Sequence, residues 1–189
     1  MTNVKKKIFS VGLIAMISLS ITTGVFADTK TNDVDINVQA GEFSLTTSSI
    51  ESFGNITLLA TPQTYNTSFQ NGFTVKDLRG SQAGWRLDVE ASPFTSGANT
   101  LPKGSLTLDP IFEINRVGTG SGNPPTKSTT TNVVIDDGKI EIARAGAGEG
   151  MGVFEITFPN DALSLVVDAT TAKVGTYEST LTWTLVTAP

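Results

Sequence analysis

The sequence predicts an all-β protein: a single-domain antiparallel β-sandwich, immunoglobulin-like or related. Three observations lead to this prediction. After residue 27 the chain is rich in threonine and poor in lysine and arginine, a composition that favours strands. Apolar and polar residues alternate over many short stretches. Turn-forming residues separate these stretches at a spacing typical of a sandwich, and no segment shows a clean helical period.

The first 27 residues are predicted to be a secretion signal. Three lysines at positions 5–7 precede an apolar stretch from Ile8 to about Ile21, and Val25-Phe26-Ala27 forms a small-x-small cleavage signature. An apolar run of about 14 residues is shorter than the roughly 20 that a spanning helix needs. We therefore expect cleavage after Ala27, a domain over residues 28–189, and no transmembrane span in the mature chain.

Half-buried strands are expected wherever apolar residues recur at every second position. The first is Asp33–Val38, in which Val34, Ile36 and Val38 alternate with polar residues. Others contain Phe73 and Val75; Trp85, Leu87 and Val89; Leu106 and Leu108; Phe112 and Ile114; and Ile140 and Ile142. Gly152–Phe158, Leu163–Val167 and Thr176–Thr187 are three more predicted strands.

Turns and loops divide these strands. Asp136-Asp137-Gly138 lies between two apolar stretches, and its Asp-Gly pair predicts a tight hairpin between 133–135 and 139–142. Residues 118–131 and 145–152 are rich in glycine and small polar residues, so they are expected to be loops. Neither loop needs to be a domain boundary, because strands resume on both sides.

Composition excludes several classes of function. The mature chain has ten basic and eighteen acidic residues, a net charge of -8, so it lacks the attraction that nucleic acid or an anionic wall polymer would require. The absence of cysteine excludes disulfides, thiolate metal sites and lipoprotein attachment, and there is no histidine. We expect no cofactor and no metal.

Catalysis is not expected either. Without histidine and cysteine, the remaining route is a pair of carboxylates that converge on a glycosidic bond. Asp136 and Asp137 are adjacent in the chain, so their side chains diverge, and turn formation explains them better.

The last predicted strand has one apolar face, which carries Trp183 and Leu185. Large apolar residues on such a face usually fill a core. Alternatively, the indole is exposed as a platform that stacks on sugar rings. Trp85 and Leu87 repeat the arrangement, which suggests either paired core positions on opposite sheets or one shared surface.

Two longer motifs carry a family resemblance. The first motif is V-x-D-x-R-G-x-x-x-G-W-x-L-x-V (Val75–Val89), and the second is the terminus G-T-Y-x-S-T-L-T-W-T-L-x-x-A-P (Gly175–Pro189). Together they resemble the WxL domain of low-GC Gram-positive bacteria. The resemblance extends over nearly the whole mature chain.

This resemblance implies a protein that is held non-covalently on peptidoglycan at the surface of a Gram-positive bacterium. Expected partners are peptidoglycan, a membrane-anchored WxL-interacting protein and other WxL proteins. The implied binding residues are Trp85, Leu87, Trp183 and Leu185. An alternative is a structural or adhesive surface subunit whose main contact is another protein, through an exposed sheet edge.

Overall fold

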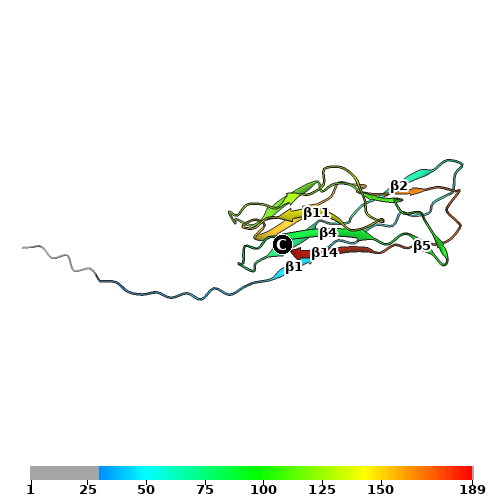
Figure 1. Ribbon diagram of the computed structural model, residues 1–189. Helices are drawn as coiled ribbons and strands as arrows, with labels where there is room; N and C mark the ends of the chain where they lie inside the picture. Colours follow the sequence, from blue (N-terminus) through cyan, green and yellow to red (C-terminus); the bar gives the residue numbers. More distant parts are fainter. Residues whose placement is uncertain (1–29, 189) are drawn as a thin grey trace, which may run out of the picture. The chain divides into compact units, whose positions relative to one another are not determined.

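The computed structural model describes residues 30–188 (Figure 1), and within this range the protein consists of strands and loops without a helix. The predicted all-β class is therefore confirmed. The predicted secretion signal, residues 1–27, lies outside the described residues. The strands are β1 (Phe43–Thr46), β2 (Gln63–Thr67), β3 (Phe73–Asp77), β4 (Trp85–Ala91), β5 (Thr95–Ser96), β6 (Asn99–Thr100), β7 (Leu106–Leu108), β8 (Glu113–Val117), β9 (Thr126–Lys127), β10 (Val133–Val134), β11 (Ile140–Ala145), β12 (Gly152–Thr157), β13 (Leu163–Val167) and β14 (Leu181–Thr187).

The strands form three four-stranded antiparallel sheets and one short hairpin. Sheet I has the order β1-β3-β12-β8, sheet II β10-β7-β13-β2, and sheet III β14-β4-β11-β9; β5 and β6 form the hairpin. The chain passes directly between sheets I and II at four places, from β1 to β2, from β2 to β3, from β7 to β8 and from β12 to β13. The antiparallel sandwich is the predicted fold.

The core is built from alternate residues of the central strands. In β4, Trp85, Leu87 and Val89 are fully buried, and in β3 Phe73 and Val75 are too. Sheets I and III meet through these faces, since the ring centroids of Phe73 and Trp183 are 4.7 Å apart. Burial of such large apolar side chains is the main stabilising contribution to the fold.

Most of the alternating segments form strands in the predicted places, but the first does not. Residues 33–38 belong to no strand, and Val34, Ile36 and Val38 are 91%, 87% and 82% exposed. Alternation creates an apolar face, but a strand also needs a neighbour to accept its backbone hydrogen bonds. The prediction of a half-buried strand at Asp33–Val38 is therefore wrong.

The predicted hairpin around Asp136-Asp137-Gly138 is also wrong. Val133 and Val134 pair with Leu108 and Thr107 of β7 in sheet II, whereas β11 pairs with β4 and β9 in sheet III. The segment connects two sheets and does not return along the same one.

The buried carboxylate of Asp136 explains this connection. It accepts hydrogen bonds from the backbone amides of Gly104, Ser105 and Leu106 at 2.9, 3.0 and 3.1 Å. Nearby, Ile135 donates its amide to Leu106 and accepts the amide of Ala91, so the same segment joins β7 to β4. Asp136 is thus an anchor between sheets.

Candidate functional site

The two Trp-x-Leu motifs lie on neighbouring strands of sheet III, side by side in Figure 1. In the antiparallel register of β4 and β14, Leu185 is opposite Leu87, and Trp183 is opposite Val89. Residues directly opposite in such a pair share one face of the sheet. The motifs therefore share one inner face and do not occupy opposite sheets.

Trp85 is enclosed in the core. It has no exposed surface, and its indole Nε1 donates a hydrogen bond to the Gly150 carbonyl at 3.0 Å. A Cβ atom at Gly150 would lie 2.6 Å from that nitrogen, so only glycine lets the loop before β12 approach the ring. Leu87 is also fully buried, so neither residue can touch a polymer in the folded protein.

Trp183 differs from Trp85 because it retains part of its surface, as does Leu185. Its ring packs edge-on against Phe73 and within 6.0 Å of Phe69 and Phe158, which lie in the connections between sheets I and II. Such aromatic contacts are each worth about 0.5–1.5 kcal/mol beyond burial. The indole thus closes the side of the core and does not project as a free platform.

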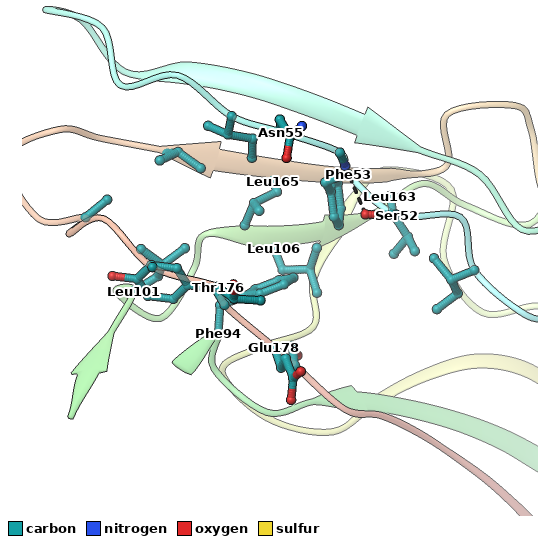
Figure 2. Close-up of a pocket in the computed structure, with 18 of the residues that line it drawn as sticks. Ser52, Phe53, Asn55, Phe94, Leu101, Leu106, Leu163, Leu165, Thr176 and Glu178 are labelled. Carbon is teal, nitrogen blue, oxygen red and sulfur yellow. Dashed lines mark hydrogen bonds between the residues drawn. The ribbon is translucent and has the colours of Figure 1, made fainter. Parts of the chain in front are cut away.

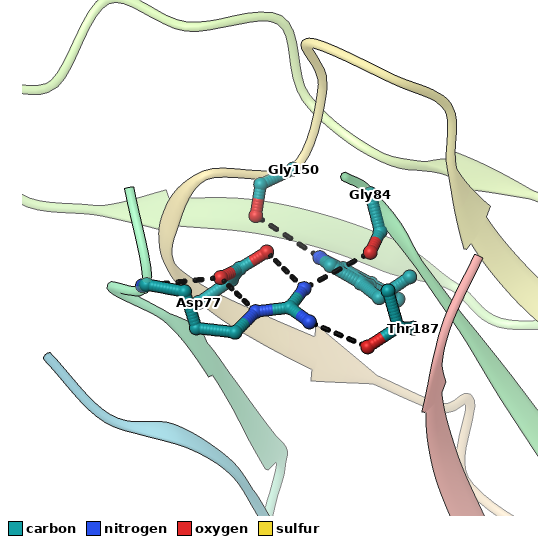
Figure 3. A network of polar contacts seen from close by, with 6 residues as sticks. Asp77, Gly84, Gly150 and Thr187 are labelled. Carbon is teal, nitrogen blue, oxygen red and sulfur yellow. Dashed lines mark hydrogen bonds and ion pairs between the residues drawn. The ribbon is translucent and has the colours of Figure 1, made fainter. Parts of the chain in front are cut away.

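A polar network that includes Asp77, Gly84 and Thr187 lies at the end of β14 (Figure 3). The guanidinium of Arg79 donates to both carboxylate oxygens of Asp77, each at 2.8 Å. It also donates to the Gly84 carbonyl at 3.0 Å and to the Thr187 hydroxyl at 2.6 Å. It lies 3.6 Å from the centre of the Phe43 ring in β1. One side chain therefore connects β1, β3 and β14 with Gly84, the residue before β4.

The charges in this network stabilise one another. Hydrogen bonds from the Arg79 side chain hold the pKa of Asp77 below its usual value, although burial opposes this effect. The same hydrogen bond raises the pKa of Arg79. Because Asp77 is 2% exposed at its side chain and Arg79 19%, the pair is shielded from solvent and has a structural role.

The longer motif is explained by these contacts. Gly84 has φ +74°, and a Cβ atom there would lie within 2.6 Å of two carbonyl oxygens, those of Ala145 at the end of β11 and of Gly146 after it. The sequence showed the spacing of Asp77, Arg79 and Gly84 but did not reveal that they meet. An aspartate and an arginine two residues apart at a strand end is the signal that could have suggested the ion pair.

A second candidate site is an apolar groove of about 950 Å³ beside sheet II (Figure 2). It lies at the start of β14, where two loop segments, residues 50–58 and 172–180, line the groove together with β7 and β13 of sheet II. Its apolar lining includes Phe53, Phe94, Leu101, Leu106, Leu163 and Leu165. Sequence patterns did not indicate it, because the lining comes from distant loops and strands.

Most of the exposed residues that line the groove are polar, although Leu58 and Val174 are exposed there as well. Glu51, Ser52, Asn55, Lys173, Thr176 and Glu178 contribute to its lining, and all are exposed. Phe53 and Phe94 are half-buried and lie edge to face with ring centroids 6.0 Å apart. Apolar walls with a few polar groups at the mouth are typical of ligand sites. Among residues 30–188, no group of three or more acidic side chains is placed to hold a metal ion.

Comparison with protein families identifies the chain. The family model described as WxL domain surface cell wall-binding matches residues 25–189. The chain belongs to the WxL domain family. No curated protein and no solved structure matches this WxL domain significantly.

Membership places the WxL domain at the cell surface, in association with the cell wall. The family description is one of binding and not of catalysis. Within the described part of the chain, no helix is long and apolar enough to cross a membrane.

Proposed function

We propose that this WxL domain is a non-catalytic protein that a Gram-positive bacterium secretes and holds non-covalently on its peptidoglycan. Attachment is direct or passes through a membrane-anchored WxL-interacting protein, with other WxL proteins as neighbours. The match of the cell wall-binding family model to residues 25–189 carries this proposal. The predicted signal over residues 1–27 supports secretion.

The apolar groove is the proposed contact site for the wall. Peptidoglycan presents sugar rings and short peptides, which combine apolar surface with many hydrogen-bonding groups. The groove offers the half-buried rings of Phe53 and Phe94 together with Asn55, Thr176 and Glu178 at its mouth. Stacking on rings and hydrogen bonding need no net charge, which suits an acidic protein on an anionic wall.

Within this proposal the Trp-x-Leu motifs act in two ways. Trp85 and Leu87 act through the fold, because they have no exposed surface. Trp183 and Leu185 retain partial exposure, so they remain candidates for direct contact with the wall or a partner. The loss of Trp85 would weaken attachment by destabilising the domain.

The proposal is tested by co-sedimentation of the purified mature chain with isolated peptidoglycan, alone and with the candidate membrane-anchored partner. We expect the chain to pellet with peptidoglycan in at least one of these mixtures and to stay soluble when peptidoglycan is omitted. A chain that stays soluble at every concentration, with and without the partner, contradicts the proposal.

A second candidate function is a structural or adhesive subunit whose main contact is another protein. The observation that favours it is the edge strand β14, which pairs with β4 on one side only. A stable complex or polymer that forms without any glycan distinguishes this function from wall binding.

A further inference from the structure

The segment Asp33–Val38 has the pattern of a strand but no strand partner. Val34, Ile36 and Val38 alternate with Asp33, Asp35 and Asn37, and the three apolar side chains are 82–91% exposed. Leaving three such side chains in water is unfavourable, because burial of their apolar surface against another surface would stabilise them. A segment of this kind is suited to add to the edge of another sheet.

The acceptor edge is β14, the longest edge strand of the three sheets. Within residues 30–188, the backbone hydrogen bonds recorded for β14 run toward β4, so its other edge is unpaired. Proteins usually protect such an edge with charge or proline. The seven residues Leu181–Thr187 contain neither.

Partly exposed apolar side chains line this edge. On the inner face of β14, Leu181, Trp183 and Leu185 are only half-buried. Phe43 and Leu45 of β1, the edge strand of sheet I, are half-buried as well. The two edges come together where Arg79 contacts both the Phe43 ring and the Thr187 hydroxyl. An apolar seam therefore runs between the edges of sheets I and III.

The segment and the seam match in length and polarity. Six residues of extended chain span about 20 Å, close to the length of β14. When Val34, Ile36 and Val38 face the seam, they cover Trp183 and Leu185. Asp33, Asp35 and Asn37 then lie on the outer face beside Thr182 and Thr184, where they supply the charge that the edge lacks.

Turn chemistry argues against the same chain filling its own seam. The amide of Gly41 donates to the Leu78 carbonyl at 2.8 Å, which extends the pairing of β1 with β3. If Asp33–Val38 were to fold back along the free edge of β1 in its own chain, the chain would therefore have to reverse direction at Gln39 and Ala40. Tight reversals favour glycine, asparagine or aspartate, and neither position has one.

From these observations we propose that Asp33–Val38 adds as an extra strand to the β14 edge of a second copy of this chain. Reciprocal addition closes a dimer, and one-way addition builds an open chain of copies. Copies linked in this way would form a continuous layer. The proposal does not rest on wall binding, because it is measured without peptidoglycan.

The first test compares the oligomeric state of the mature chain with that of two variants by analytical ultracentrifugation. Ile36→Asp places a charge in the seam, and we expect at least tenfold weaker self-association. The matched control Asp35→Asn changes the outer face and keeps self-association. Because both side chains lie outside the strands of the domain, the melting temperature of the isolated protomer stays unchanged.

Two outcomes overturn the proposal. A wild-type chain that is monomeric at all concentrations shows that no second copy is bound. A monomer that Ile36→Asp destabilises shows that the segment covers the seam of its own domain. Self-association that Ile36→Asp does not weaken is equally contradictory, because it places the contact elsewhere.

Disulfide trapping locates the contact. Because the chain has no native cysteine, only the introduced thiols can form a disulfide. One tagged copy carries Thr184→Cys, and a second copy with another tag carries Asp33→Cys, Asp35→Cys or Asn37→Cys. We expect a disulfide between the two tags for at least one of these pairs. The control Thr119→Cys, in a loop between β8 and β9, gives none. Cross-linking no stronger than this control contradicts addition at β14.

Discussion

Trp85 shows how one side chain joins two parts of the fold, because its ring fills the core while its nitrogen fixes the loop before β12. Trp85→Phe removes the donor and leaves the Gly150 carbonyl unpaired, which should cost about 1–3 kcal/mol of unfolding free energy. Trp85→Ala should cost about 3–5 kcal/mol. Chemical denaturation measures both values.

The control for this prediction is Trp183→Phe. Trp183 packs against three phenylalanine rings, and a phenylalanine in its place keeps part of these contacts, so we expect a smaller loss than for Trp85→Phe. Equal losses at the two positions would mean that the hydrogen bond to Gly150 contributes nothing.

Asp77 makes the stability of the domain dependent on pH. Because Arg79 lowers the pKa of folded Asp77 below 3.8, the stabilisation is complete above that value and is lost as pH falls through the lower, folded pKa. Asp77→Asn should cost about 3 kcal/mol at pH 7 and flatten the fall in unfolding free energy below pH 4. Denaturation over the range from pH 7 to about pH 2 tests this.

Glu42 supplies a matched acidic control. Its pKa is also lowered, by hydrogen bonds from Ser44 and Lys76, but its side chain is 54% exposed. Solvent screens such a pair, so Glu42→Gln should leave both the stability at pH 7 and its acid dependence nearly unchanged. An unaltered acid profile in Asp77→Asn would contradict the role given to the buried pair.

At the scale of elements, Asp136 fixes the connection between sheets II and III. Asp136→Ala leaves the amides of Gly104, Ser105 and Leu106 without their acceptor, and we expect a loss of about 3 kcal/mol. The neighbouring Asp137 pairs with Lys103 at the surface, so Asp137→Ala should cost less than about 1 kcal/mol. Thermal denaturation of both variants checks the contrast.

The connection at Asp136 also shows what local sequence can and cannot predict. Alternation located the central strands β3, β4, β7, β11, β12 and β13 because each buries one face. Asp-Gly suggested a hairpin, yet a buried carboxylate that binds three amides is a long-range feature without a local pattern. Strand positions were therefore predictable, whereas strand partners were not.

The first and last alternating segments of the chain also show that strand positions can be predicted more readily than strand partners. Asp33–Val38 and Leu181–Thr187 both alternate, and only the second has a partner, β4. For the candidate sites, the motifs around Trp85 and Trp183 were visible in the sequence, but their shared face was not. The groove was not predictable, because residues from 50 to 181 meet there without any periodicity.

At the scale of the whole molecule, charge decides how attachment depends on salt. A mature chain with a net charge of -8 gains no long-range attraction from a wall that is generally polyanionic. We expect the fraction bound to peptidoglycan to change little between low and high salt in co-sedimentation. A steep loss with salt would mean that ion pairs drive the binding.

The central claim is that the apolar groove makes the contact with the wall. Thr176→Trp fills the mouth of the groove, and Thr119→Trp places the same ring on an exposed loop outside it. Both variants should show wild-type circular dichroism and melting temperature, since both side chains are exposed.

The deciding measurement is co-sedimentation of these two variants with isolated peptidoglycan, in the mixture in which the wild-type chain pellets. The account predicts at least tenfold weaker binding for Thr176→Trp and wild-type binding for Thr119→Trp. Wild-type binding by folded Thr176→Trp would contradict the account and place the wall contact outside the groove.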